Sequence, residues 1–152
     1  MVTLVDEPVG EVYDRLLDYA VRVRSQFSLV WRQQLKCAES AQTIARRLKP
    51  DLISEARTDA WPGTQLLGHV ATVRMYRLSA KALAVLRETP RLYDWRAPSH
   101  PEDLAFYTPD GRPWLGSIAH ERDAFVDPSA IDVGELTAQV PGLKLEQDPG
   151  SF

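Results

Sequence analysis

Cysteine is almost absent from this sequence of 152 residues, in which Cys37 stands alone. A single thiol excludes an internal disulfide and any zinc site built from several cysteines. A chain of this length can bury about 70% of the surface that it exposes when unfolded, so it needs neither a disulfide nor a bound metal in order to fold. We therefore expect one domain over residues 1–142, followed by a flexible C-terminal tail over 143–152.

Long apolar runs are missing as well. No stretch approaches the ~18 consecutive apolar residues of a membrane-spanning helix. The first residues include Asp6 and Glu7, where a secretion signal needs basic residues. The composition, with 44% hydrophobic and 26% charged residues, is that of a globular protein. The sequence therefore predicts a cytoplasmic protein that does not bind a membrane.

Lysine is scarce, since fourteen of the 18 basic residues are arginine, and with 11 prolines this is typical of a GC-rich bacterial genome. The net charge of −3 is unevenly distributed. The chain from residue 102 onward holds ten acids and three bases and carries −7, so residues 1–101 carry +4. An acidic end of this kind favours a basic partner through long-range attraction.

The motifs of several common enzyme classes are absent. No G-x-S-x-G elbow surrounds a serine, and neither a G-x-x-x-x-G-K-[ST] nor a G-x-G-x-x-G loop is present to bind phosphates. The three histidines, His69, His100 and His120, lack the spacing that places two metal ligands on one helix. We therefore expect no cofactor and no metal.

The spacing of the apolar residues predicts an α+β fold. Helical spacing indicates helices over 8–24, 38–48, 51–56, 79–88 and 132–140. Clustered β-branched and aromatic residues favour strands over 26–32 and 64–78. Because neither glycine nor proline interrupts residues 11–49, one long helical run through 25–50 remains the alternative.

The clearest element is a β-hairpin over about 103–119. Two alternating apolar runs, at 103–108 and 112–119, flank the residues Thr-Pro-Asp-Gly, which favour a tight turn. We expect this C-terminal hairpin to belong to a small antiparallel sheet, with the helices packed mainly on one face.

Four polar and charged side chains follow the hairpin: His120, Glu121, Arg122 and Asp123. If the second strand continued through them, alternation would place them on two opposite faces and they would not converge. If the strand ended at Ala119, they would form a turn at the end of a strand, where functional sites are often built.

An enzyme built on this turn would use His120 as a general base, because imidazole titrates near neutral pH. Its acidic partner would be Glu121 or Asp123. If neither faced the imidazole, the partner would come from elsewhere in the chain, and the candidates are His69, His100 and Glu102. Without a nucleophile motif, the sequence assigns no catalytic residue, and a small hydrolase remains an alternative function.

Aromatic residues beside arginine indicate a contact surface in the proline-rich link Tyr93-Asp94-Trp95-Arg96. Exposed aromatic and arginine side chains are the residue types that anchor protein interfaces. We therefore predict a non-enzymatic protein-binding module, with the profile of a toxin-immunity protein or an antitoxin. The predicted partner-binding residues are Tyr93, Trp95, Arg96, His120, Glu121, Arg122 and Asp123.

A nucleic-acid-associated regulator is a third hypothesis. It requires Arg46, Arg47, Arg74 and Arg77 to share one face of the protein. The sequence pI of about 5.6 argues against a dedicated nucleic-acid-binding domain, which is normally basic.

Overall fold

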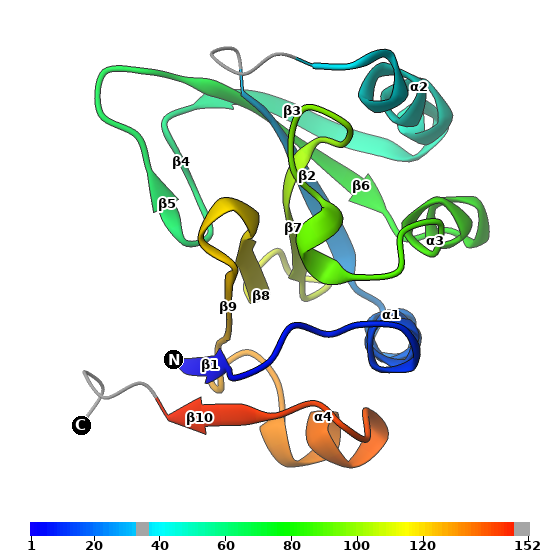
Figure 1. The fold of residues 1–152 in the computed structure, drawn as a ribbon, viewed down its shortest axis with the longest axis vertical. Coiled ribbons are helices and arrows are strands. Elements are labelled where there is room, and N and C mark those ends of the chain that lie inside the picture. The colour runs from blue at the N-terminus through cyan, green and yellow to red at the C-terminus, as the bar shows by residue number, and fades with distance from the viewer. Residues whose placement is uncertain (33–36, 148–152) are drawn as a thin grey trace.

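One antiparallel sheet of eight strands organises the computed structural model, which describes residues 1–32 and 37–147 (Figure 1). The strand order is β10-β1-β9-β8-β7-β2-β6-β3, and all neighbours are antiparallel. The strands are β1 (Val2–Leu4), β2 (Gln26–Arg32), β3 (Leu52–Thr58), β6 (Ala71–Arg77), β7 (Glu102–Tyr107), β8 (Pro113–Ile118), β9 (Asp123–Val126) and β10 (Leu145–Gln147). The α+β class is confirmed, but the sheet is not small.

The sheet is larger than expected because it includes four strands that the sequence did not indicate, β1, β3, β9 and β10. β1 and β10 have three residues each, and β9 has four. Such short segments show too little alternation to be recognised in a sequence. Within the segment 143–152, β10 pairs with β1 from Leu145 to Gln147, and the flexibility expected of this tail stays a prediction. Residues 148–152 lie outside the described residues.

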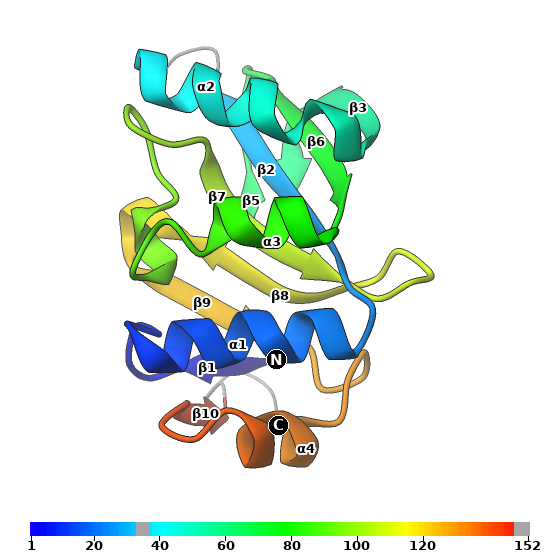
Figure 2. The ribbon, with the colours of Figure 1, turned by 90° about the vertical axis from the view of Figure 1, so that its right-hand side faces the viewer.

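Three helices lie along one face of the sheet: α1 (Glu11–Arg22), α2 (Glu39–Leu48) and α3 (Ala80–Leu86) (Figure 2). The fourth helix, α4 (Val133–Gln139), lies at the end of the sheet near β10 (Figure 1). Two of these helices begin at capping residues visible in the sequence. The hydroxyl of Ser79 and the carboxylate of Asp132 each accept a hydrogen bond, 3.1 Å long, from the backbone amide three residues later.

The core lies between these helices and the sheet. Alternation in β2 places Phe27 and Leu29 against the helices, whereas Val30 packs on the opposite face. The strand expected at 26–32 is thus confirmed, and the alternative of one helical run through this segment is wrong. Residues 33–36 of that run lie outside the described residues.

The helix expected over 51–56 is wrong. Pro50 ends α2 in the short turn η1 (Lys49–Asp51), and the chain then enters β3, which pairs with β6 as an edge strand of the sheet. Pairing with β6 here overrides the local helical spacing of the apolar residues.

None of the helices in the described part of the chain is long and apolar enough to cross a membrane.

A second, two-stranded sheet consists of β4 (Ala60–Trp61) and β5 (Thr64–Gln65). The strand expected over 64–78 is therefore divided into β5 and β6, with a loop between them. Trp61 of this hairpin packs on Val30 and Ala71, on the face of the sheet away from the core helices. This hairpin covers part of the second face.

Candidate functional site

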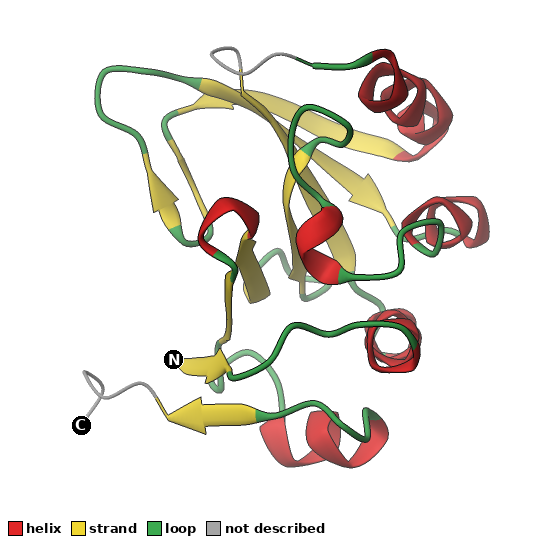
Figure 3. Cartoon of the chain, in the orientation of Figure 1, coloured by secondary structure: helices red, strands yellow, loops and turns green. Residues whose placement is uncertain are grey.

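Two single turns of 3-10 helix bring the two predicted contact segments together. η2 (Leu92–Asp94) follows α3, and η3 (Ala119–Glu121) connects β8 to β9. The two turns contact each other and are the small red coils near the centre of Figure 3. Because β8 ends at Ile118, residues 120–123 begin as a turn, which is the second of the two arrangements expected from the sequence.

Glu7, in the segment between β1 and α1, joins the two turns. Its Oε2 accepts a hydrogen bond of 2.8 Å from the backbone amide of Tyr93, and its Oε1 accepts one of 2.9 Å from Nη2 of Arg122. The Arg122 guanidinium also lies 5.5 Å from the centre of the Tyr93 ring. Only 6% of the Glu7 side chain is exposed, so a largely buried carboxylate holds η2 and η3 in place.

A groove of about 390 Å³ opens beside these turns, and we call it the arginine groove. It is lined by Arg91, Tyr93, Asp94, Arg96, Ala97, Pro98, Ser99, His100 and Arg122. Among these lining residues, three arginines face one carboxylate, that of Asp94. Within residues 1–32 and 37–147, no carboxylate pairs with the side chain of Arg91 or Arg96. Arg91 and Arg96 therefore carry their positive charge at this groove without a close ion pair to a described carboxylate, although the Asp94 carboxylate lines the same groove.

Two further ionisable groups of the arginine groove, His100 and Tyr93, are neutral near pH 7. Burial lowers the pKa of His100, although nearby Asp94 partly opposes this shift. Burial, with smaller contributions from the charges of Asp123 and Glu7, raises the pKa of Tyr93 to about 12. The positive charge of the groove thus comes from its arginines, which stay protonated.

Glu102 and His120 form a close pair at the base of η3. Nε2 of His120 lies 2.8 Å from Oε1 of Glu102, and that oxygen also accepts a hydrogen bond of 2.8 Å from the backbone amide of Ala97. The Glu102 side chain is 2% exposed and the His120 side chain 42% exposed. A buried carboxylate that fixes a partly exposed imidazole is one way to orient a general base.

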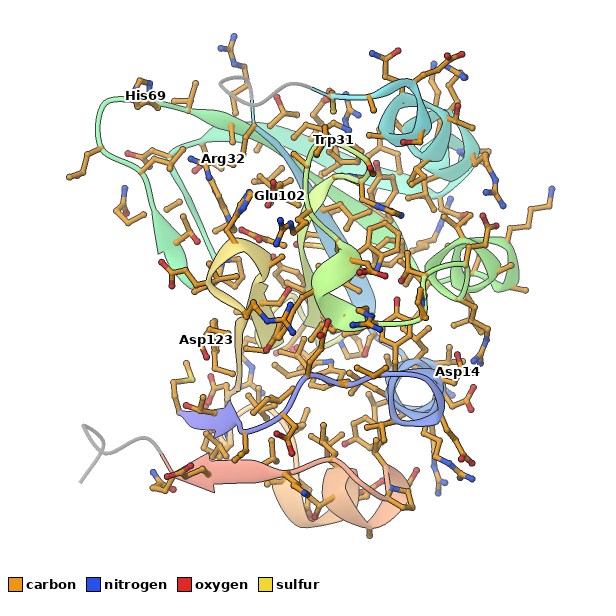
Figure 4. All side chains as sticks on the ribbon, in the orientation of Figure 1. Asp14, Trp31, Arg32, His69, Glu102 and Asp123 are labelled. Atoms are coloured by element: carbon orange, nitrogen blue, oxygen red, sulfur yellow. The ribbon has the colours of Figure 1, made fainter. Side chains whose placement is uncertain are left out.

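Of the candidate partners considered for His120, only Glu102 hydrogen-bonds to it among the described residues. Glu121 lies exposed in η3, and Asp123 begins β9 opposite Ile118. Figure 4 places His69 in the outer loop between β5 and β6, well apart from Glu102.

Asp103 is a structural residue that the sequence did not identify. It has a left-handed backbone, with φ of 56°, at the irregularity where β7 pairs with β2. Its carboxylate accepts hydrogen bonds from Nε1 of Trp61 at 2.9 Å and from the backbone amide of Ala119 at 3.0 Å. Burial raises the pKa of Asp103, and these two hydrogen bonds oppose the shift. Asp103 thus ties the β4–β5 hairpin and η3 to the sheet.

Trp95 does not lie at the surface, in contrast to the expectation from its neighbours. Its side chain is fully buried, and its Nε1 donates a hydrogen bond of 2.9 Å to the Tyr13 hydroxyl. The link folds back onto α1 and α3, so it buries this indole while leaving Arg96 exposed. Trp95 therefore cannot contact a partner in this structure, and we remove it from the proposed contact surface.

The acids of the C-terminal third do not form one acidic face. Glu102 and Asp103 are buried. Asp127 and Asp132 accept hydrogen bonds from nearby backbone amides, and Asp110 accepts one from a neighbouring hydroxyl. The exposed acids outside these arrangements include Glu121, Glu135 and Glu146. They belong to three separate elements, η3, α4 and β10.

The four arginines of the nucleic-acid hypothesis do not gather on one free surface. Arg46 and Arg74 line one cavity of about 340 Å³, whereas Arg47 lines a different hollow beside α3. Arg47 and Arg74 are each paired with a glutamate, and Arg77 donates to a backbone carbonyl at 3.4 Å. This arrangement gives the hypothesis no support.

Comparisons with protein-family models, with curated proteins and with solved structures found no match for this chain. The function proposed below is therefore inferred from the geometry of the residues.

Among the residues that the structure describes, no group of three or more His, Cys, Asp or Glu side chains is placed to hold a metal ion.

Proposed function

We propose that this chain is a non-enzymatic protein-binding module whose contact surface is the arginine groove together with the turn 120–123. One observation carries the proposal. Arg91 and Arg96 lie at a groove without a carboxylate partner among the described residues, whereas Arg47 and Arg87 elsewhere on the surface are ion-paired. The Tyr93 ring is largely buried, with 5% of the residue exposed, so it supports the groove and does not itself offer a contact surface. Arginine is among the residue types that dominate many protein interfaces.

A module of this kind suits a protein that blocks its partner, as toxin-immunity proteins and antitoxins do. Charge at the contact surface would steer the encounter and select the partner. The acidic C-terminal third of the sequence predicted a basic partner. The exposed acids outside the groove would contact basic groups of that partner, and this stays a prediction. The arginine groove itself favours acidic groups on the partner.

The substitution Arg96→Glu is expected to weaken binding of the natural partner by about tenfold or more, because it places a negative charge in the contact surface. Affinity capture from cells that naturally contain this chain supplies the partner, and calorimetry then measures its Kd. Lys81→Glu is the matched control, since it makes the same charge change at an exposed position in the first turn of α3. Equal Kd values for the two variants, or no stoichiometric partner at all, would refute the proposal.

A small hydrolase-like enzyme is the second candidate, and the contact between His120 and Glu102 favours it. In this reading the buried carboxylate of Glu102 orients the imidazole, and His120 acts as the general base. Glu121 and Asp123, considered from the sequence, would have no part in the proton transfer.

For the second candidate, His120→Ala is expected to lower kcat/KM by about 10²–10⁴-fold, the usual contribution of a general base. The assay is a panel of esters, amides and phosphoesters with the purified protein. His69→Ala, in the outer loop, is the control and should leave turnover unchanged. If the wild type turns over no substrate faster than the His120→Ala variant does, this candidate is wrong.

A further inference from the structure

We infer that the arginine groove receives an acidic segment of the partner protein, with carboxylates of that segment paired to Arg91 and Arg96. This inference rests on the proposed protein-binding function and adds the chemistry of the bound segment.

The positions of the two unpaired arginines suit carboxylates on an extended segment. Arg91 is the residue before η2, and Arg96 comes two residues after it, so they lie on either side of this rigid turn. Both side chains are exposed. A guanidinium presents a planar fork of donors that matches the two oxygens of a carboxylate. Two such forks favour a segment with at least two acidic residues over an isolated carboxylate.

Arg122 completes the groove from the other side. Its backbone is left-handed, with φ of 52°, where η3 ends. This conformation costs about 1 kcal/mol for a residue with a side chain, and such strain often persists at functional positions. Glu7 holds one terminal nitrogen of Arg122, while 59% of the Arg122 side chain is exposed. An incoming carboxylate can therefore use its remaining donors without breaking the bond to Glu7.

A nucleic acid fits this surface less well than an acidic peptide does. Nucleic-acid binding depends on many basic residues arranged along the phosphate backbone. Outside the groove, Arg15, Arg47, Arg74 and Arg87 are already ion-paired. The groove itself presents three arginines, one of which is already paired with Glu7, and this small set suits a short acidic segment.

The test uses a fluorescent peptide of alternating glutamate and serine, titrated against the full chain at low ionic strength. We expect saturable binding that weakens at least about tenfold in the double variant Arg91→Gln/Arg96→Gln, and that also weakens as salt is added. The control variant Lys49→Gln/Lys81→Gln removes the same charge outside the groove and should bind the peptide as the wild type does. Both double variants change exposed residues and should keep the wild-type melting temperature.

Two outcomes would overturn the inference. Either the two double variants bind the peptide equally, or a single-stranded oligonucleotide of equal charge binds the groove more tightly than the peptide. Competition against the captured partner separates this inference from the proposal that it rests on. A partner lost in Arg96→Glu but not displaced by the acidic peptide would refute the acidic segment and leave protein binding standing. A partner that Arg96→Glu does not weaken would refute the protein-binding surface itself.

Discussion

Replacing Trp95 with alanine is expected to lower the free energy of unfolding by about 3–5 kcal/mol, the usual cost of truncating a buried tryptophan. The indole is fully buried and donates to the Tyr13 hydroxyl, which in turn donates a hydrogen bond of 2.7 Å to the backbone carbonyl of Leu86. The substitution leaves a cavity among α1, α3 and the link, and it removes one bond of this buried chain. Equilibrium unfolding in urea, followed by far-ultraviolet circular dichroism, measures the loss.

Trp31→Ala is the matched control for Trp95→Ala. Trp31 is only half-buried, with the Arg74 guanidinium 4.5 Å from its ring centre, so its truncation should cost about half as much. If Trp95→Ala changed the unfolding free energy by less than about 1 kcal/mol and abolished partner binding, Trp95 would be a surface contact and its burial would be wrong.

Replacing Asp103 with alanine is expected to lower the free energy of unfolding by about 3–7 kcal/mol, through a different mechanism. Two buried donors, Nε1 of Trp61 and the amide of Ala119, would lose their acceptor, at about 1–3 kcal/mol each. Alanine would also have to adopt the left-handed backbone of this position, at a further cost of about 1 kcal/mol. Urea unfolding gives the total.

Asp103→Asn separates the two contributions. Asparagine tolerates the left-handed backbone and keeps one acceptor oxygen, so it should lose about half as much stability as alanine. Equal unfolding free energies for the two variants, both close to the wild type, would contradict the anchoring role of Asp103.

The parts of the fold that the sequence predicted correctly depend on local signals. Ser79 and Asp132 cap their helices through amides three residues later, and the turn of the 103–119 hairpin is visible in its own residues. β1, β9 and β10 could not be predicted in the same way. Each has only three or four residues. β1 and β10 pair with each other from opposite ends of the chain, as when Val2 pairs with Gln147, and β9 pairs with the nearby β8 and the distant β1.

The candidate site shows the same division between local and distant contacts. Arg96 and Arg122 were predicted as contact residues from their neighbours, and the structure places both at one groove. Trp95 has the same local context as Arg96, and only the folding of the link onto the core distinguishes the two. Glu7 could not be identified, because its bond to Arg122 spans 115 residues.

Glu102 did leave a signal in the sequence. It stands with a second acid at the start of an otherwise apolar strand, where two carboxylates must be either exposed or hydrogen-bonded. In the structure both are buried and both accept hydrogen bonds. Two acids at the start of an apolar strand therefore indicate buried, hydrogen-bonded carboxylates that stabilise the fold or belong to a site.

The central claim is that the arginine groove and the turn 120–123 form the surface that contacts another protein. Amide hydrogen exchange of the purified complex, compared with the free chain, tests this claim most directly. We expect slower exchange on complex formation in residues 91–100 and 119–123, and unchanged exchange along the edge strand β3. Protection confined to β3 or to the exposed face of α2, with residues 91–100 and 119–123 unchanged, would contradict it.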